Sequence, residues 1–165
     1  MQRALSVNLG TALVHLFPPK HHSRALRVLD DVLSQDPNCV LALMGRAYVM
    51  QAARKWSDAR LLFAKVVKIR TLSDVGMGLE AKEEWAWCGA MEALQVEEVE
   101  AKEKLEEALN ALTDVKDHLE TEEGLESRKA RVWWRLGQCY WRLGGASSYS
   151  LDNTSHRQIY RRLGS

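Results

Sequence analysis

Apolar residues recur every three or four positions along most of this chain, which is the spacing of one face of an α-helix. Two such stripes precede the turn Asp36-Pro37-Asn38, and two more follow it at an offset of 34 residues. Proline stops a helix and suits a turn, so each pair of stripes predicts two antiparallel helices. The inward-facing residues are Leu9, Leu13 and Leu16, then Ala25, Leu29 and Val32, then Leu43, Ala47 and Met50, and finally Ala59, Phe63 and Val66.

A small residue begins the second stripe of each pair, as Ala25 and Ala59. Two helices cross closely at such a position, so a bulky side chain would push them apart. The period of 34 residues, with large and small positions in a fixed order, is typical of the tetratricopeptide repeat. The sequence therefore predicts an all-α solenoid of helical hairpins, with seven main helices.

A third pair of stripes has a looser spacing. Trp85, Ala86 and Gly89 belong to its first helix and Ala101, Leu105 and Ala108 to its second. The separation between Ala86 and Ala101 is three residues longer than that between Ala47 and Ala59, so an insertion is expected in the turn. Residues 113–124 are polar and acidic, and they are predicted to form a long linker between repeats.

The fourth unit contains the most specific motif, W-x₂-L-G-x₂-Y followed by a glycine. We expect Trp133, Leu136 and Tyr140 to fill the hairpin interior. Gly137 would let the neighbouring backbone approach, and Gly144 would permit the turn.

The pattern then fails, because a serine-rich stretch stands where a second helix should begin. Either Gln158–Leu163 forms a poor capping helix, or this chain is a shortened form of a longer one. We expect the unfinished hairpin to expose Val132, Leu136 and Leu143.

These observations predict about three and a half repeats. The array covers residues 1–143, and residues 144–165 form an irregular or weakly helical tail. The units lie at about residues 6–39, 40–73, 74–112 and, incomplete, 125–143.

Composition excludes several classes of protein. No apolar run approaches the roughly 18 to 20 residues that a membrane helix needs. Three cysteines (Cys39, Cys88 and Cys139) form no disulfide framework, so we expect an intracellular protein with buried thiols.

Residues 71–126 carry 17 acidic and 4 basic residues, whereas the segments on either side are basic. This acidic centre either orients partners or forms a solvated helix face.

Motifs for catalysis are absent: there is no HExxH, GxxxxGK[ST], nucleophile elbow or GxGxxG. The histidines are scattered, and no carboxylate pair stands out as desolvated. We therefore expect no enzyme activity, no metal, no cofactor and no small-molecule substrate.

Two tryptophan-rich segments carry a more specific resemblance. The runs EAKEEWAWC (residues 80–88) and RKARVWWRLGQCYW (residues 128–141) are similar to segments of the tetratricopeptide scaffold of the fungal superkiller complex. That family forms a long superhelix that holds an RNA helicase and a WD-repeat subunit and delivers messenger RNA to the exosome for 3′→5′ decay. The resemblance implies protein partners, indirect contact with RNA, no membrane, and a cytoplasmic location, with the nucleus as a second compartment.

Two other binding functions compete with this interpretation. A co-chaperone clamp for a terminal carboxylate needs cationic and amide groups, but the corresponding positions hold Gly10, Val14, Gly45, Glu80 and Glu84. Direct RNA binding could use aromatic rings beside Arg128, Arg131, Arg135 and Arg142. Trp133 and Tyr140 are assigned to the core. The candidate partner surface is therefore Tyr48, Trp134, Trp141 and Arg135.

Overall fold

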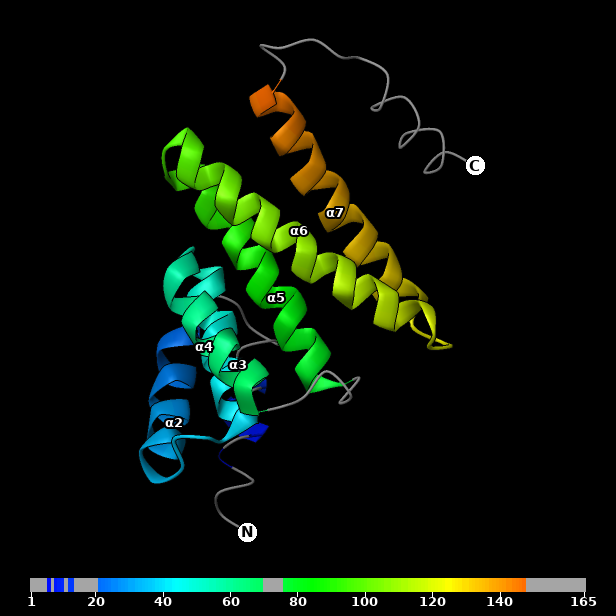
Figure 1. The fold of residues 1–165 in the computed structure, drawn as a ribbon. Coiled ribbons are helices and arrows are strands. Elements are labelled where there is room, and N and C mark those ends of the chain that lie inside the picture. Colours follow the sequence, from blue (N-terminus) through cyan, green and yellow to red (C-terminus); the bar gives the residue numbers. More distant parts are fainter. Residues whose placement is uncertain (1–5, 7, 11, 14–20, 70–75, 148–165) are drawn as a thin grey trace.

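The computed structural model describes residues 6, 8–10, 12–13, 21–69 and 76–147, and within these ranges it is all-helical (Figure 1). Residues 6, 8–10 and 12–13 are helical and precede six complete helices. The predicted all-α class is confirmed. The elements are α2 (His22–Gln35), α3 (Val40–Ala52), α4 (Trp56–Ile69), α5 (Met77–Glu92), the short 3₁₀ helix η1 (Ala93–Gln95), α6 (Glu98–Glu120) and α7 (Glu126–Ser147).

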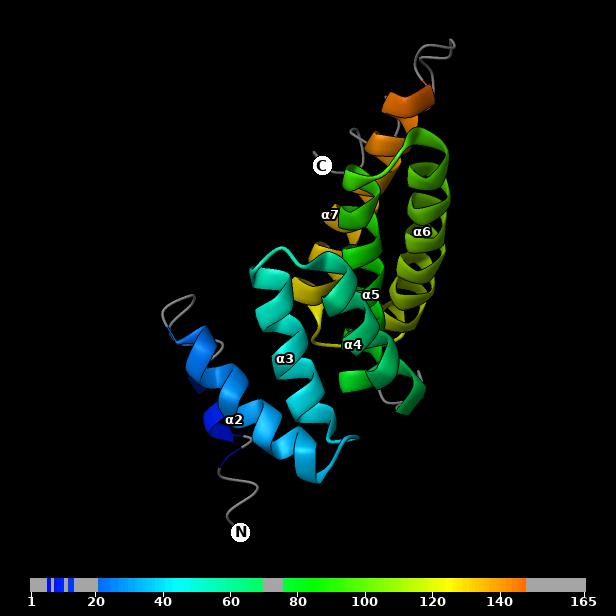
Figure 2. The same ribbon diagram turned by 90° about the vertical axis from the view of Figure 1, so that its left-hand side faces the viewer.

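Each helix packs against the next one along the chain, and Figure 2 shows the succession from α2 to α7. α5 also contacts α7, two helices further on. This order is that of stacked hairpins, in which each unit contacts its neighbours. The helices α3, α5 and α7, which are the first helices of successive hairpins, therefore form one side of the stack.

The side chains that the 34-residue period places at helix crossings are buried. Ala25, Ala59 and Phe63 are fully inaccessible to solvent, and Leu29, Val32, Leu43, Ala47 and Val66 are at most 3% exposed. Met50 and Ala101 are half-buried, while Leu9 is 46% exposed. Leu16 and Val14 lie outside the described residues.

The predicted turn between the first two units is confirmed. α2 ends at Gln35, and the carboxylate of Asp36 accepts a hydrogen bond from the backbone N–H of Asn38 at 3.1 Å. Pro37 is exposed, and its carbonyl accepts a hydrogen bond from the Lys65 ammonium at 2.6 Å. This bond ties the turn to α4.

The predicted insertion in the third unit is η1, which joins α5 to α6. The predicted linker over residues 113–124 is wrong for residues 113–120, because α6 continues to Glu120. Val115 and Leu119 are fully buried and keep the helical spacing of Leu112, so the acidic residues between them occupy only the outer face. The chain turns after α6, where Gly124 adopts a φ of +78° that L-residues rarely adopt.

Gly144 does not end its helix, as the sequence suggested. α7 runs through Gly144 to Ser147, since glycine weakens a helix without breaking it. Residues 148–165, including Gln158–Leu163, lie outside the described residues.

Burial of Cys88 and Cys139 predicts that their thiols react much more slowly than the thiol of Cys39. Desolvation raises the pKa of Cys88 to about 12 and that of Cys139 to about 11. At pH 8 the thiolate fraction of Cys88 is therefore roughly one in ten thousand, and it rises with pH. Cys39 is half-buried. We expect iodoacetamide to modify Cys39 at least about tenfold faster than Cys88 in the native protein, as followed by peptide mass spectrometry. Equal rates for the two thiols without urea would contradict this packing.

Candidate protein-binding site

The central helix α5 carries two adjacent buried carboxylates, Glu83 and Glu84, which are 0% and 3% exposed. They are buried because α5 packs against α4, α6 and α7, and its other buried residues are small or apolar except for Glu92. Buried carboxylates are costly unless they are paired and hydrogen-bonded. The partners of these two come from the helices on either side, α3 and α7.

Glu83 is the centre of an arginine cluster from α7. Arg131 binds it in a bidentate manner, with Nε–Oε1 and Nη2–Oε2 distances of 2.7 and 2.8 Å. Arg135 Nη1 lies 2.9 Å from Oε1, and Arg128 Nε lies 3.3 Å from Oε2. The three arginines are spaced i, i+3 and i+7, so they share one face of α7. The hydrogen bond that Arg131 makes to Glu83, together with the charge of that carboxylate, raises the pKa of Arg131.

Glu84 continues the network toward α3. It accepts two hydrogen bonds from Arg135 Nη2, at 2.9 and 3.0 Å, and a third from Gln51 Nε2 at 2.8 Å. The hydroxyl of Tyr48 donates to Glu80, one turn earlier on α5. Burial, together with the charges of Glu80 and Glu84, raises the pKa of Tyr48, so this hydroxyl remains a donor. The network therefore connects α3, α5 and α7 across two repeat boundaries.

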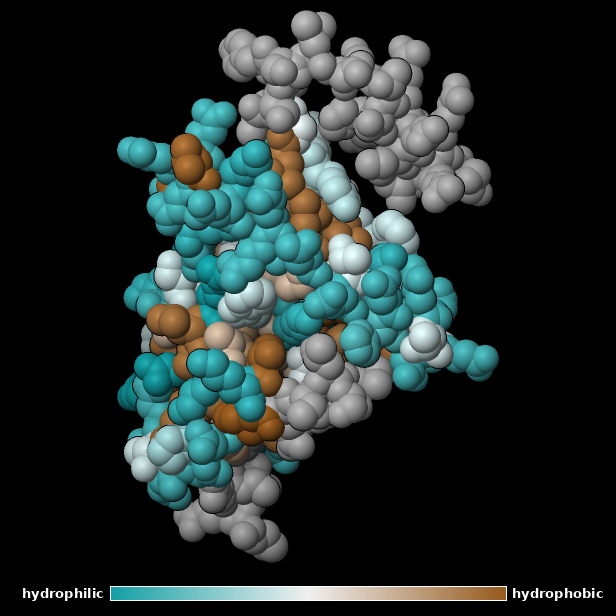
Figure 3. Space-filling view, viewed as in Figure 1, coloured by the Kyte–Doolittle hydropathy of each residue, from teal (hydrophilic) through white to brown (hydrophobic). Residues whose placement is uncertain are grey.

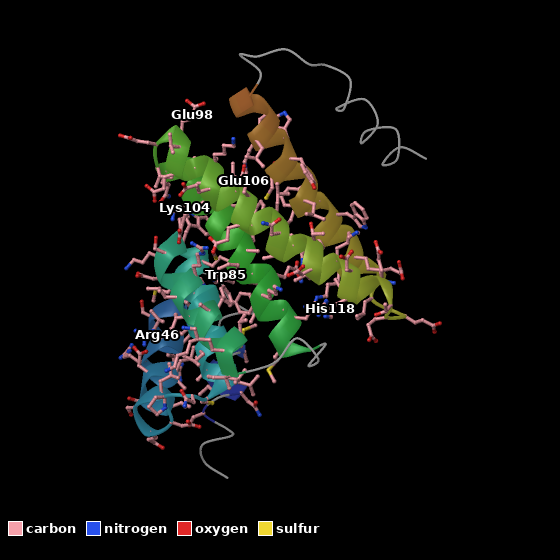
Figure 4. All side chains as sticks on the ribbon, in the orientation of Figure 1. Arg46, Trp85, Glu98, Lys104, Glu106 and His118 are labelled. Carbon is pink, nitrogen blue, oxygen red and sulfur yellow. The ribbon has the colours of Figure 1, made fainter. Side chains whose placement is uncertain are left out.

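A second polar cluster joins α4, α5 and α6 (Figure 4). Glu92 is 6% exposed and lies 3.4 Å from Arg60 and 3.0 Å from Lys104. The Arg60 guanidinium also stacks over Trp85, 4.6 Å from the ring centroid. Together with the Glu83 cluster, these pairs show that part of the acidic centre neutralises basic residues within the fold. Other carboxylates of the acidic centre are exposed, such as Glu98 and Glu106 on α6.

The outer side of α7 is rich in exposed aromatic rings. It has two rows, which we call the glycine row (Trp133, Gly137, Tyr140 and Gly144) and the tryptophan pair (Trp134 and Trp141). The tryptophan pair lies toward α5: the rings of Trp134 and Trp87 are 5.4 Å apart, and Trp134 and Trp141 are 55% and 60% exposed. Figure 3 shows hydrophilic surface over α6 and apolar surface where α6 meets α7.

The prediction that Trp133 and Tyr140 fill the hairpin interior is not met. Both are 47% exposed, and the Lys116 ammonium lies 5.3 Å from the Trp133 ring centroid. The residues expected to be exposed are instead covered: Val132 and Leu136 are 0% and 3% exposed, and Leu143 is half-buried. α5 and α6 pack against the side of α7 that holds Val132 and Leu136. No described residue covers the opposite side, where a second helix of the hairpin would lie.

The four residues of the candidate partner surface differ in their exposure to solvent. Trp134 and Trp141 are exposed, but Arg135 is 7% exposed and paired with both carboxylates of α5. Arg135 is therefore a structural residue here, which corrects the sequence-based assignment. Tyr48 is half-buried and hydrogen-bonded. Sequence reasoning missed Glu83 and Glu84, although the i, i+3, i+7 arginines of α7 were a signal for a buried anionic partner.

Among the residues that the structure describes, no group of three or more histidine, cysteine, aspartate or glutamate side chains could hold a metal ion. None of the described helices is long and apolar enough to cross a bilayer. Exposed tryptophans on a helix held by buried ion pairs are the kind of rigid aromatic anchor found at the centre of protein interfaces.

Comparison with known proteins relates part of the chain to a yeast protein. A segment of 65 residues, 39% of this chain, is 32% identical to Superkiller protein 3 of Saccharomyces cerevisiae. The matched segment corresponds to about 4% of the length of that yeast protein. No protein-family profile matches the chain. The similarity agrees with the resemblance of the tryptophan-rich segments, and it concerns a small part of a much longer relative.

Proposed function

We propose that this chain is a non-catalytic protein-binding scaffold of the superkiller type, acting in cytoplasmic 3′→5′ messenger RNA decay with the exosome. The similarity to Superkiller protein 3 and the stacked helical hairpins support the proposal. The partners would be an RNA helicase and a WD-repeat subunit, as the resemblance implies. Stacked hairpins suit this task because they present a rigid surface spread over several repeats.

The observation that carries the proposal is the tryptophan pair beside the buried network. Trp134 and Trp141 are exposed, yet the helix that bears them is fixed to α5 by the arginines of the Glu83 cluster. Rigid aromatic side chains lose little conformational entropy on binding, so they contribute strongly to interfaces. Arg128, Arg131 and Arg135 are directed to carboxylates, which argues against a phosphate-binding surface and favours indirect contact with RNA.

The test is a pull-down of the purified helicase and WD-repeat subunits with the full chain. We expect the double variant Trp134→Ala/Trp141→Ala to weaken capture by about tenfold or more, because hot-spot truncations typically cost about 2 kcal/mol. The matched control is Leu61→Ala, which removes a side chain that is 72% exposed on α4. Its capture should equal that of the unmodified chain.

Three results would contradict the proposal. Capture of neither subunit, with recovery of peptides that end in a heat-shock-type acidic carboxylate, would favour the co-chaperone alternative. Equal loss of capture in the tryptophan variant and the Leu61 control would remove the tryptophan pair from the interface. Tight binding of a single-stranded RNA that depends on Trp134 and Trp141 would favour direct RNA recognition.

A further inference from the structure

The exposed side of α7 repeats every seven residues, which is close to two helical turns. Small residues recur at positions 130, 137 and 144, with aromatic residues at 133 and 140 on one flank and at 134 and 141 on the other. We call the glycine row, the tryptophan pair and Ala130 together the α7 face. A Cβ atom added to Gly137 would meet nothing within 4 Å, whereas one added to Gly45 would lie 3.1 Å from Leu29. The α7 face therefore has a low central strip between two aromatic edges.

The area of the α7 face is sufficient for a specific contact. Its four aromatic side chains are between 47% and 60% exposed. An aromatic side chain offers about 150–250 Å², so four half-exposed rings leave about 400 Å² uncovered. Two such faces in contact would bury about 800 Å² from the rings alone. The small residues and the edges of the face bring this total to about 1,000 Å², which is the area that a specific interface needs.

The chemistry of the α7 face suits an apolar protein surface. Between positions 130 and 144 the charged residues are three arginines, and all three contact α5. Arg131 and Arg135 bind Glu83, and the Arg142 guanidinium lies 5.5 Å from the ring centroid of Trp87. Tryptophan and tyrosine without charged residues are the usual composition of the centre of a protein interface.

The order of residues on the α7 face reads the same in both directions. Counted from Gly137, small residues stand at −7 and +7, and aromatic residues stand at −4, −3, +3 and +4. A second α7 that runs antiparallel therefore presents the same pattern, with its own Gly137 opposite the first. A twofold interface requires a patch that matches its own copy in this way. The antiparallel direction is also favoured because the positive end of each helix dipole then lies beside the negative end of the other.

We propose that two copies of this chain pair through the α7 face, with the helices antiparallel and both Gly137 residues at the twofold axis. The small residues let the two backbones approach closely. Trp133 of one copy then lies beside Tyr140 of the other, and Trp134 lies beside Trp141. This pairing does not rest on the proposed function. It does cover the tryptophan pair, so a second copy and a captured subunit exclude each other on one α7.

The test is sedimentation equilibrium of the full chain over a range of concentrations. We expect the mass to rise from that of one chain to that of two, with a Kd in about the micromolar range. Gly137→Glu should raise this Kd by at least about tenfold, because two carboxylates would face each other at the twofold axis. The variant should fold, since the surroundings of Gly137 are open and glutamate favours a helix more than glycine does. The matched control Leu61→Glu adds the same charge at an exposed position of α4 and should leave the Kd unchanged.

Disulfide cross-linking tests the direction of the helices, in a chain with Cys39 replaced by serine. Gly137→Cys should form a bridge between two copies, because a close crossing brings the paired Cα atoms within the range of about 4.4–6.8 Å that a disulfide spans. Ala130→Cys is the control on the same strip. Antiparallel pairing holds its two copies about 21 Å apart, at about 1.5 Å per residue, so its bridge should form at least about tenfold more slowly.

Three results would overturn the proposal. A chain that stays monomeric at every concentration would show that a second copy does not bind this face. A dimer that Gly137→Glu and Leu61→Glu weaken equally would have its contact elsewhere. Equal bridging through positions 130 and 137 would mean parallel pairing or random collision. These measurements contain no helicase and no WD-repeat subunit, so failure of the pairing leaves the proposed function standing, and failure of capture leaves the pairing standing.

Discussion

Replacement of Glu83 by glutamine is expected to lower the free energy of unfolding by about 3–5 kcal/mol, the usual result of breaking a buried ion pair from one side. Glu83 is fully buried and accepts hydrogen bonds from Arg128, Arg131 and Arg135. Glutamine keeps the shape of the side chain but removes its charge and one acceptor. Arg135 would retain only Glu84 among its carboxylate partners, and the guanidinium groups would repel one another.

Urea denaturation followed by circular dichroism measures this change. The control is Glu106→Gln, the same chemical change at an exposed position of α6, which should alter stability by at most about 0.5 kcal/mol. Similar midpoints for the two variants would mean that the Glu83 cluster is solvated. A fall in the free energy of unfolding that is confined to Glu83→Gln would show that the contact between α5 and α7 depends on this cluster.

The cluster has a consequence for binding as well as for stability. α7 carries the tryptophan pair, and its arginines fix the helix to α5 at three points along about two turns. Because the ion pairs are directional, they set the rotation of α7 about its axis as well as its distance from α5. Loss of the cluster should therefore weaken partner capture even where the helix remains folded.

The sequence predicted the hairpin array because each first and second helix has its own apolar period. Ala59 and Phe63 could be placed in the core from the repeat pattern alone, since the same positions recur 34 residues apart. The three-residue insertion that became η1 was visible for the same reason. Repeats supply an internal comparison, so each unit predicts the packing of the next.

Prediction from the sequence failed where packing depends on a neighbouring helix or on pairing between residues far apart in the chain. Trp133 and Tyr140 match a motif whose core role requires a second helix, and both side chains are 47% exposed. Glu83 looks like a surface glutamate within an acidic segment, and its burial follows only from the arginines about 50 residues away. Residues 113–120 looked like a linker because acidic residues outnumber apolar ones there. However, Val115 and Leu119 sufficed to bury one face.

The burial of Ala59 between two helices can be tested most sharply by replacing its side chain with a large one. Ala59 is fully buried where α3 and α4 cross, in the same cluster as Ala47 and Phe63. Ala59→Trp introduces a ring system into a space that holds a single methyl group, so the two helices must separate or the side chains must leave their preferred rotamers. Overpacking of this kind costs about 1–3 kcal/mol and more in the tightest sites, and we expect a loss of about 3 kcal/mol.

The matched control is Leu61→Trp, two residues along the same helix at a side chain that is 72% exposed. The incoming residue and the helix are the same, so only the facing direction differs. Differential scanning calorimetry should show a large fall in melting temperature for Ala59→Trp and a small change for Leu61→Trp. Equal shifts would place the two residues on equivalent faces. They would contradict the 34-residue register, because position 59 is the small position of that register and position 61 is not.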